Sequence, residues 1–312
     1  MKKKFFLVLL IFFVMTFIGC SKSSEDKQEL STEIKSEQTL QKSENDTKVA
    51  TLDRLTFAIV PSSNPVNFYE KIKPLVTYLE KKIERKIIVK FEVNYENIAK
   101  SLGEDYDFAM MGAYSYIEAN KLNGAEAIVK SIRQGKPHYN ALIVAHMSSG
   151  LKNIKDLKNY NNLKYGFTDK FASAGFLFPA AELIKAGVDF SKANYKFIKG
   201  YDNVLKSLIL KSIDIGVCYS GAIEQYLTQD EIKNIVVLKT TDAIPADPIV
   251  ISKKVAEDKE LKSKLIAAFL DLKDTNILSA LAAGLDGYAA ASDKDYNVLR
   301  EKINIVNKHF KF

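Results

Sequence analysis

The sequence predicts an α/β protein with two lobes, each built on a mostly parallel sheet whose faces are covered by helices. Short apolar strands alternate with amphipathic helices, which is the pattern of such sheets. The order strand, helix, strand, helix, strand occurs twice along the chain without repetition of sequence. Two further apolar segments connect the series, so we expect a hinge made of two crossing segments.

The first series ends at a glycine, Gly112. Apolar clusters of strand length alternate with stretches that repeat apolar residues at helical spacing. The expected elements are strands at Leu55–Val60, Ile87–Val93 and Phe108–Met111, and helices at Phe68–Ile83 and Tyr95–Leu102. A loop of Pro, Ser and Asn at 61–65 follows the first strand.

The second series has the same order in the middle of the chain. Its expected elements are strands near Tyr165–Phe167, at Tyr195–Ile198 and at Ile215–Tyr219, and helices at Ala174–Ala186 and Asn203–Leu210. The apolar segments Ala141–Ala145 and Ile244–Val250 are the expected crossings. Helices within 255–272, 276–283 and 295–306 are expected to pack on the first lobe.

The N-terminus has the layout of an export signal. Three lysines precede an apolar run, Phe5–Ile18, and Gly19 precedes Cys20. The run is shorter than the roughly 20 apolar residues that a membrane-spanning helix needs. We therefore predict a lipoprotein signal at 1–19, cleaved before Cys20, which then carries the lipid. An uncleaved anchor is the alternative.

The stretch 20–52 is predicted to be a disordered tether. It is rich in Ser, Lys, Glu, Gln, Asn and Thr, and the part from Ser21 to Ala50 contains neither Gly nor Pro. Such a composition buries too little apolar surface to offset the entropy of ordering. The chain has two cysteines, Cys20 and Cys218, so lipidation of the first leaves no partner for an internal disulfide.

The charge pattern argues against binding to nucleic acid. Removing the three signal lysines lowers the net charge from +7 to +4. The other lysines are scattered through helical stretches, for example Lys81–Lys82 and Lys253–Lys254. A solvated surface with a weak attraction for anions follows.

Several collinear segments resemble motifs of a known family. The segments are Asp107–Gly112 with Tyr116 and Ala119, Tyr139–Val144, Ala172–Pro179, Gly200–Asp202 and Ile244–Val250. They are similar to motifs of the phosphonate, phosphite and phosphate-type periplasmic binding proteins of ABC importers. Each motif alone is weak, but a collinear series across roughly 54–300 seldom arises by chance.

The resemblance implies a two-lobed periplasmic-binding-protein-like fold of type II. The first lobe would comprise 53–145 and 247–312, and the second lobe 146–246. The resemblance also implies a small anionic ligand in the cleft between the lobes, no cofactor, and an ABC permease in the cytoplasmic membrane as partner. The expected location is the periplasm or the outer face of the cytoplasmic membrane, with a lipid anchor at Cys20.

The chain departs from the family motifs around the expected site. Hydroxyl residues of the family are replaced by Ala172 and Ala174, which leaves Ser173. Met111 stands in place of a tyrosine, and Tyr201 in place of a histidine. The pocket is therefore expected to be less polar than usual, which favours a ligand with an organic substituent over bare phosphate.

Backbone and hydroxyl groups are the expected ligand donors. A helix that begins near Ala174 would direct backbone N–H groups and the positive end of its dipole at the cleft. We therefore expect Ser173, Ala174 and Gly175 to bind an anion without Lys or Arg. Further donors are the hydroxyl groups of Ser62, Ser63, Tyr114, Tyr139 and Tyr219. An ordinary helix N-cap is the alternative role of Ser173.

Two further residues have a structural and a functional interpretation. Asp202 precedes an amphipathic run and reads as an N-cap, whereas the resemblance implies that it faces a ligand's amino group or accepts a ligand hydroxyl. Met111, beside Gly112 at the end of a strand, is a candidate lining residue, whereas Met110 reads as core.

No combination of residues predicts catalysis or a metal site. The three histidines, His138, His146 and His309, lack metal-ligand spacing. Cys218 ends an apolar strand and reads as a small buried residue. The sequence contains neither a Gly-x-Ser-x-Gly elbow nor a glycine-rich phosphate loop. We therefore expect no enzyme.

Alternatives to an importer component stay open. A lipoprotein that reports to a sensor kinase would have the same sequence features, and so would a binder of a non-phosphorus solute. An enzyme on the same scaffold, or a structural or adhesive lipoprotein with an incidental cleft, belongs to a different class, because a fold does not by itself define a function.

Overall fold

The computed structural model describes residues 54–60, 65–92, 94–160 and 162–310. The predicted signal, Cys20 with the tether, Ser62 and Ser63 lie outside these residues. Asp53–Phe312 forms one compact unit. Within the described ranges, no helix has both the length and the apolar composition needed to cross a membrane.

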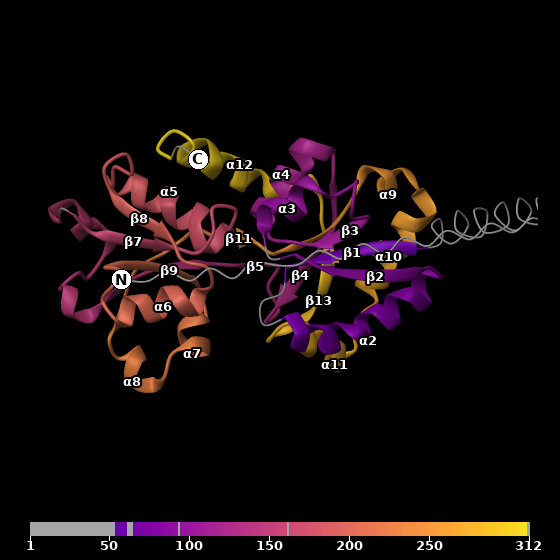
Figure 1. The fold of residues 1–312 in the computed structure, drawn as a ribbon, viewed down its shortest axis with the longest axis horizontal. Helices are drawn as coiled ribbons and strands as arrows, with labels where there is room; N and C mark the ends of the chain where they lie inside the picture. Colours follow the sequence, from indigo (N-terminus) through magenta and orange to yellow (C-terminus); the bar gives the residue numbers. More distant parts are fainter. Residues whose placement is uncertain (1–53, 61–64, 93, 161, 311–312) are drawn as a thin grey trace, which may run out of the picture. The chain divides into compact units, whose positions relative to one another are not determined.

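A six-stranded sheet forms the centre of the first lobe, with the strand order β13-β4-β12-β3-β1-β2. Figure 1 labels five of these strands, β1, β2, β3, β4 and β13. The strands are β1 (Arg54–Ile59), β2 (Lys86–Phe91), β3 (Phe108–Met110), β4 (Glu126–Arg133), β12 (Pro248–Ile251) and β13 (Leu285–Ala290). β1 is parallel to β2 and β3, and β12 and β13 are antiparallel to their neighbours. The parallel strands therefore all end at the same edge of the sheet.

Helices cover both faces of this sheet. They are α2 (Pro65–Ile83), α3 (Tyr95–Lys100), α4 (Ala113–Asn123), α9 (Lys253–Glu257), α10 (Lys259–Leu270) and α11 (Thr275–Leu281). On one face, α2, α10 and α11 pack together, and Leu79 shares an apolar core with Phe269. α3 and α4 lie on the other face (Figure 1), where Ile98 and Tyr116 belong to a second core. Burial on both faces explains the continuous apolar run of β1.

A five-stranded sheet forms the centre of the second lobe, in the order β10-β6-β9-β7-β8. The strands are β6 (Ala141–His146), β7 (Lys164–Phe167), β8 (Asn194–Phe197), β9 (Ile215–Tyr219) and β10 (Ile235–Thr240). β7 is parallel to β8 and β9, and β6 and β10 are antiparallel additions. A π-helical turn (Ser173–Leu177) continues as α5 (Phe178–Lys185), and the other helices are α6 (Tyr201–Ile209), α7 (Ala222–Tyr226) and α8 (Gln229–Ile232).

The chain passes between the sheets through two short strands that pair with each other. β5 (His138–Tyr139) leads from the first sheet into the second, and β11 (Ile244–Pro245) leads back. The two strands are antiparallel, with Tyr139 opposite Ile244. The predicted two-lobed α/β fold with two crossing segments is confirmed, but the first crossing is β5 and not the predicted Ala141–Ala145, which forms β6 of the second sheet.

Two segments differ from the sequence-based assignment. The predicted first lobe ends after residue 145, yet β6 pairs along its length with β9 in the second sheet. The helix expected within 295–306 is α12 (Asn297–Val306), which packs on α5 and the turn before it as well as on α4. It therefore departs from the expected packing on the first lobe alone. Apolar spacing shows that an element has a buried face but does not show which lobe covers that face.

Candidate ligand-binding site

The candidate site lies where one strand from each lobe leads into a helix. In the first lobe, β3 ends at Met110 and α4 begins at Ala113, with Gly112 as its N-cap residue. In the second lobe, β7 ends at Phe167 and the helical turn begins at Ser173. Helix N-termini carry backbone N–H groups without helical acceptors and a partial positive charge. Both ends are therefore suited to anionic or acceptor groups.

Ser173 connects the two lobes. Its side chain is buried, and its hydroxyl accepts a hydrogen bond from the backbone N–H of Tyr114 at 3.1 Å. The side chain of Tyr139, on the first crossing strand, also hydrogen-bonds Ser173. Ala172 occupies the N-cap position of the turn, and no side chain caps it. Ser173 is therefore not the cap of its own helix.

The π-helical turn leaves several backbone amides without a helical acceptor. The N–H of Leu177 donates to the carbonyl of Ala172 at 3.0 Å. The amides of Ser173, Ala174 and Gly175 precede this first bond, so no carbonyl of the helix is available to them. These are the amides that the sequence predicts as anion donors.

Gly175 fixes the position of this turn against the end of β7. A Cβ added to Gly175 would lie 1.7 Å from Oγ1 of Thr168. The Gly175 carbonyl also accepts a hydrogen bond from the Thr168 N–H at 3.0 Å. Ala174 is almost fully buried. The turn therefore offers backbone groups, with Ser173 as its one hydroxyl.

Asp247 is a further candidate for the site, although its position in the sequence did not single it out. It follows β11, and its carboxylate accepts a hydrogen bond from the N–H of Ala113, the first residue of α4. A Cβ built on Gly112 would lie 4.0 Å from Oδ1 of Asp247 and 3.9 Å from the ring of Tyr95. Burial raises the pKa of Asp247, while Arg133 and the Ala113 N–H act in the opposite direction. Its signal in the sequence was an ionisable residue within an apolar crossing segment.

Besides Tyr296, three tyrosines lie within electrostatic range of Asp247: Tyr95, Tyr139 and Tyr201. They come from α3, the first crossing strand and the start of α6. Burial raises the pKa of all three phenols, and the negative charge of Asp247 adds to the effect. They therefore stay protonated at neutral pH and can donate hydrogen bonds.

Tyr219 and Asp202 lie at the ends of neighbouring elements in the second lobe. The rings of Tyr219 and Tyr201 meet edge to face at 4.9 Å, and the Tyr219 hydroxyl donates to Oε1 of Gln225. Asp202 is the second residue of α6, whose N-cap is Gly200 with φ of 88°. The N-cap interpretation of Asp202 is therefore wrong, and its carboxylate lies in the first turn, where the helix dipole favours it.

Met111 and Tyr114 are almost completely buried beside this site. Met111 is 2% exposed and belongs to the same apolar core as Tyr114. The Tyr114 ring lies 5.6 Å from the ring of Phe171, which belongs to the second lobe. Met111 therefore has the surroundings of a core residue, and Tyr114 takes part in contact between the lobes.

A salt bridge connects the lobes next to this aromatic contact. Lys170 Nζ lies 3.0 Å from Glu96 Oε2, and Glu96 also pairs with Lys100 at 2.7 Å. Hydrogen bonds from Lys100 and Lys170 lower the pKa of Glu96. The ammonium of Lys170 lies 5.0 Å from the centre of the Phe171 ring. The segment that leads to Ser173 is thus held against the starts of α3 and α4.

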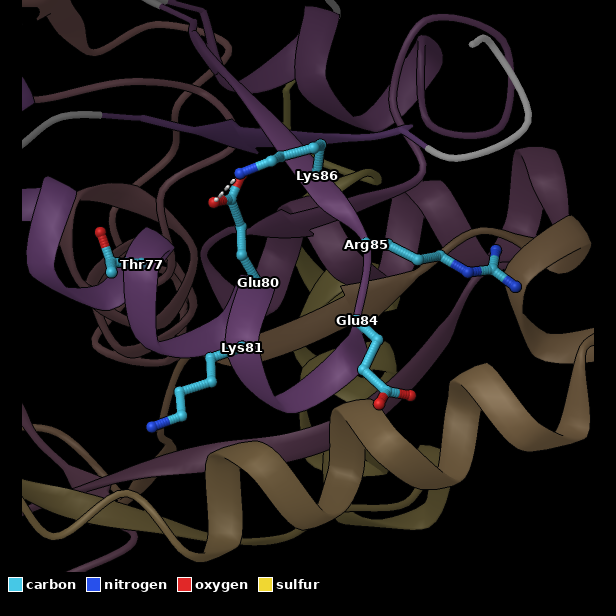
Figure 2. Close-up of a pocket in the computed structure, with 6 residues that line it drawn as sticks. All are labelled: Thr77, Glu80, Lys81, Glu84, Arg85 and Lys86. Carbon is cyan, nitrogen blue, oxygen red and sulfur yellow. Dashed lines mark hydrogen bonds and ion pairs between the residues drawn. The ribbon is translucent and has the colours of Figure 1, made fainter. Parts of the chain in front are cut away.

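A surface pocket of about 390 Å³ lies elsewhere on the first lobe (Figure 2). Its lining residues are Thr77, Glu80, Lys81, Glu84, Arg85 and Lys86. They belong to the end of α2 and the beginning of β2, which is the sheet edge opposite the strand ends described above. Lys86 pairs with Glu80 at 3.2 Å, and Arg85 with Asp258 at 3.2 Å. This pocket is therefore a mixed-charge surface groove.

The candidates for a metal site or a reactive thiol in the described part of the chain are the His, Cys, Asp and Glu side chains, and Cys218 in particular. No group of three or more His, Cys, Asp or Glu side chains there is arranged to hold a metal ion. Cys218 is fully buried in β9, and burial raises the pKa of its thiol to about 12. The thiol therefore stays protonated at neutral pH.

Fold and site together define a two-lobed binding protein of the periplasmic class. Residues 57–296 match the family described as "ABC transporter, phosphonate, periplasmic substrate-binding protein". The chain belongs to this family, which confirms the resemblance inferred from the motifs.

Named relatives support the same family at low identity. The phosphate-import protein PhnD of Mycolicibacterium smegmatis is 26% identical over 187 residues, which is 55% of this chain and 57% of that protein. The chain thus matches little more than half the length of this relative. The phosphonates-binding periplasmic protein of Escherichia coli is 24% identical over 227 residues, 71% of this chain and 67% of that protein.

A solved structure shares the fold. PhnD1 from Prochlorococcus marinus, in complex with methylphosphonate, superposes with a TM-score of 0.69 at 19% identity. The match covers 82% of this chain and 99% of that one. Similarity at this identity supports the architecture of the two lobes, and the identity of the ligand has to be argued from the site.

Proposed function

We propose that this protein is the lipid-anchored substrate-binding component of an ABC importer and that it captures a small phosphonate-type anion between its lobes. The observation that carries the proposal is the position of Ser173. Its hydroxyl lies at the start of a second-lobe helix and meets the Tyr114 N–H, at the start of a first-lobe helix, at 3.1 Å. Two helix N-termini therefore face one small region, which suits an anion.

The anion would bind to backbone and hydroxyl donors. The amides of Ser173, Ala174 and Gly175 have no helical acceptor, because they precede the first bond of the turn. Tyr139 adds a protonated phenol beside Ser173. Ser62 and Ser63 stay predicted donors from the first lobe. An oxyanion can thus be bound without a cationic side chain.

The same site favours a ligand that carries an amino group. Asp247 is half-buried, and none of the ion pairs within the described ranges involves its carboxylate. Tyr95, Tyr139 and Tyr201 lie near it, and their π-faces and its charge both attract an ammonium group. We therefore propose an aminoalkylphosphonate in preference to bare phosphate. Asp202 and Tyr219 are proposed to contact the same ligand from the second lobe.

Binding would be coupled to closure of the lobes about the two crossing strands. Three contacts between the lobes support this proposal: the Ser173 bond, the ring contact of Tyr114 with Phe171, and the Lys170–Glu96 salt bridge. We take them to belong to the closed state. A ligand that binds donors from both lobes has a higher affinity for this state and shifts the population toward it. The permease would recognise the closed state.

Export and anchoring follow from the N-terminal pattern. We propose that the signal is cleaved before Cys20, that the lipid attached there holds the protein at the membrane, and that 20–52 acts as the tether. A sensor kinase that reads the closed state is the second candidate partner. It would require the same ligand-dependent closure.

A thermal-shift screen tests the ligand class. The full-length protein is heated with phosphate, phosphite, sulfate, methylphosphonate and 2-aminoethylphosphonate in turn. A ligand at 100 times its dissociation constant stabilises the native state by about 2.7 kcal/mol. We expect the largest shift with 2-aminoethylphosphonate. Shifts with sulfate alone, or with no phosphorus oxyanion, would contradict the proposal and direct the search to other solutes.

A further inference from the structure

The C-terminal segment 292–310 contacts both lobes. It follows β13 of the first sheet, forms α12 and ends beside the second sheet. None of the residues predicted to contact the ligand lies in it. Its contacts nevertheless reach the three elements that carry Ser173, Asp247 and the first turn of α4.

Tyr296 attaches the start of this segment to the first lobe. The side chain is fully buried, and its ring meets the ring of Tyr116 on α4 edge to face at 4.8 Å. Its hydroxyl donates to the carbonyl of Ala246 at 3.2 Å. Ala246 directly precedes Asp247. The Tyr296 side chain therefore contacts both α4 and Ala246, the residue before Asp247. The carboxylate of Asp247 lies at the N-terminus of α4.

A polar network strengthens the same attachment. Oδ1 of Asp293 accepts hydrogen bonds from the Tyr116 hydroxyl at 2.7 Å and from Arg300 at 2.6 Å. Arg300 also donates to Oδ1 of Asn120 at 3.1 Å. Arg300 belongs to α12, and Tyr116 and Asn120 belong to α4. The first half of α12 is thus bound to the first lobe.

Lys302 attaches the middle of α12 to the second lobe. The side chain is 6% exposed, and its Nζ lies 2.8 Å from Asp242 Oδ2 and 3.3 Å from Glu182 Oε1. The ammonium also lies 5.6 Å from the centre of the Phe178 ring. Glu182 and Phe178 belong to α5, which continues the turn that carries Ser173. A buried ammonium with two carboxylates is costly to disrupt when one partner is removed.

An aromatic cluster attaches the end of the segment to the same lobe. Phe310 is buried, and its ring lies 4.5 Å from Phe190, 4.9 Å from Phe176 and 6.2 Å from Phe167. Phe176 lies in the π-helical turn and Phe167 at the end of β7. The last described residue thus packs under the turn that offers the predicted anion donors.

We propose that residues 292–310 form a clamp that holds the two halves of the binding site in register, with Tyr296 and Lys302 as its positioning residues. Tyr296 acts through Ala246 and α4, and Lys302 acts through α5. The inference rests on the proposed function, because it takes the ligand to bind between these elements. The clamp adds a third connection to the two crossing strands and limits the orientations that the lobes adopt. Ligand affinity then depends on residues that never touch the ligand.

Substitution of Lys302 tests the clamp. Lys302→Met keeps a long side chain but removes the ammonium, so the attachment to Asp242 and Glu182 is lost. We expect about tenfold weaker binding of 2-aminoethylphosphonate, because a smaller fraction of molecules holds the competent arrangement. Lys302→Arg retains the charge and should recover most of the affinity. Lys308→Met, an exposed lysine just beyond α12, is the matched control and should bind like the natural protein.

A ligand-free measurement separates failure of the clamp from failure of the proposed function. Spin labels at the exposed positions Lys73 and Lys192, with both native cysteines replaced by alanine, report the distance between the lobes. Lys302→Met should broaden the distance distribution, and Lys302→Arg should restore it, whether or not a phosphonate binds. An unchanged distribution in folded Lys302→Met would overturn the clamp.

A milder variant covers the case in which Lys302→Met does not fold. Tyr296→Phe keeps the ring on Tyr116 and removes only the hydrogen bond to Ala246. We expect two- to fivefold weaker binding of 2-aminoethylphosphonate, with a broader lobe distance and an unfolding midpoint close to that of the natural protein. Natural affinity and a natural distance distribution in Tyr296→Phe would contradict its role in positioning Asp247.

Discussion

The hydroxyl of Ser173, in the second lobe, accepts a hydrogen bond from the backbone N–H of Tyr114, in the first lobe, at 3.1 Å. A first-turn amide of α4 is therefore satisfied by a side chain from the opposite lobe. In the proposed hinge motion, opening of the lobes would break this bond and expose both groups to water. A bound anion that accepts from neighbouring amides would stabilise the closed arrangement around the same point.

Asp247 should determine the preference for an amino substituent. Asp247→Asn keeps an acceptor for the Ala113 N–H but removes the negative charge. We expect binding of 2-aminoethylphosphonate to weaken by about tenfold or more, because a charge-assisted contact is lost. Binding of methylphosphonate, which has no ammonium group, should change by less than about twofold. Calorimetric titration of both ligands checks this, and an equal loss for both would contradict the assignment.

The same carboxyl should leave a signature in the pH dependence of stability. Burial raises the native pKa of Asp247, so the native state holds its proton more tightly than the unfolded state, where the pKa is about 3.9. As pH rises from about 4 through the native pKa, stability falls, because the unfolded state then gives up its proton first.

Asp247→Asn has no titrating carboxyl at this position, so it does not lose this part of its stability as pH rises. Urea unfolding from pH 4 to pH 7 should therefore show that the variant gains stability relative to the natural protein as pH rises. The comparison cancels the contribution of the other carboxyl groups. A difference in unfolding free energy that is constant with pH, or that falls, would show that burial does not raise the pKa of this residue.

Gly175 should tolerate no side chain. In Gly175→Ala, the added Cβ would lie 1.7 Å from Oγ1 of Thr168 and 2.9 Å from its Cβ. The turn must shift, and we expect a loss of about 1–3 kcal/mol in unfolding free energy together with weaker anion binding. Thr168→Gly should restore part of the loss in the double variant.

Gly187→Ala is the control, because its added Cβ has no atom within 4 Å. Its only expected cost in unfolding free energy is the strain of placing alanine at a φ of +96°. Unfolding in urea gives both values. A loss in Gly175→Ala no larger than that in Gly187→Ala would show that the turn is not held against Thr168.

The salt bridge between Lys170 and Glu96 should contribute to closure. Lys170→Glu replaces the ammonium that lies 3.0 Å from Glu96 with a second carboxylate. Because the two carboxylates repel each other across the lobes, we expect ligand affinity to fall by about three- to tenfold. Glu96→Lys should weaken binding in the same way. The double exchange restores opposite charges, so most of the affinity should return.

Titrations at low and high salt check the electrostatic origin. The defect of each single variant should shrink at high salt, because screening weakens the repulsion. Additive losses in the double exchange would contradict a direct pairing of the two residues across the lobes.

The strands and helices could be predicted because their signals are local. The pattern at Leu55–Val60 matches β1, and the helix expected at Ala174–Ala186 begins at Ser173. The π-helical form of its first turn could not be predicted, because no local pattern distinguishes the bond from Leu177 to Ala172 from an ordinary helical bond. The family motifs predict Ser173 as a ligand contact, which stays a prediction, whereas its bond to the Tyr114 N–H joins segments that no local pattern connects.

Relations between distant segments could not be predicted in the same way. Asp247 becomes a candidate site residue only where the return crossing meets the start of α4, and no spacing in the sequence links it to Ala113. The second-lobe contacts of α12 depend on Lys302 meeting Asp242 and Glu182, which are far apart in the chain. The predicted donors Ser62 and Ser63, outside the described residues, stay predictions.

Isothermal titration of 2-aminoethylphosphonate into the natural protein and into Ser173→Asp tests the central claim most directly. A carboxylate at the first turn would occupy the amides and repel an anion, since both compete for the same positive helix end. We predict saturable binding at one site in the natural protein and at least about 100-fold weaker binding in Ser173→Asp, equivalent to about 2.8 kcal/mol. Equal binding by both proteins would contradict an anion site at Ser173.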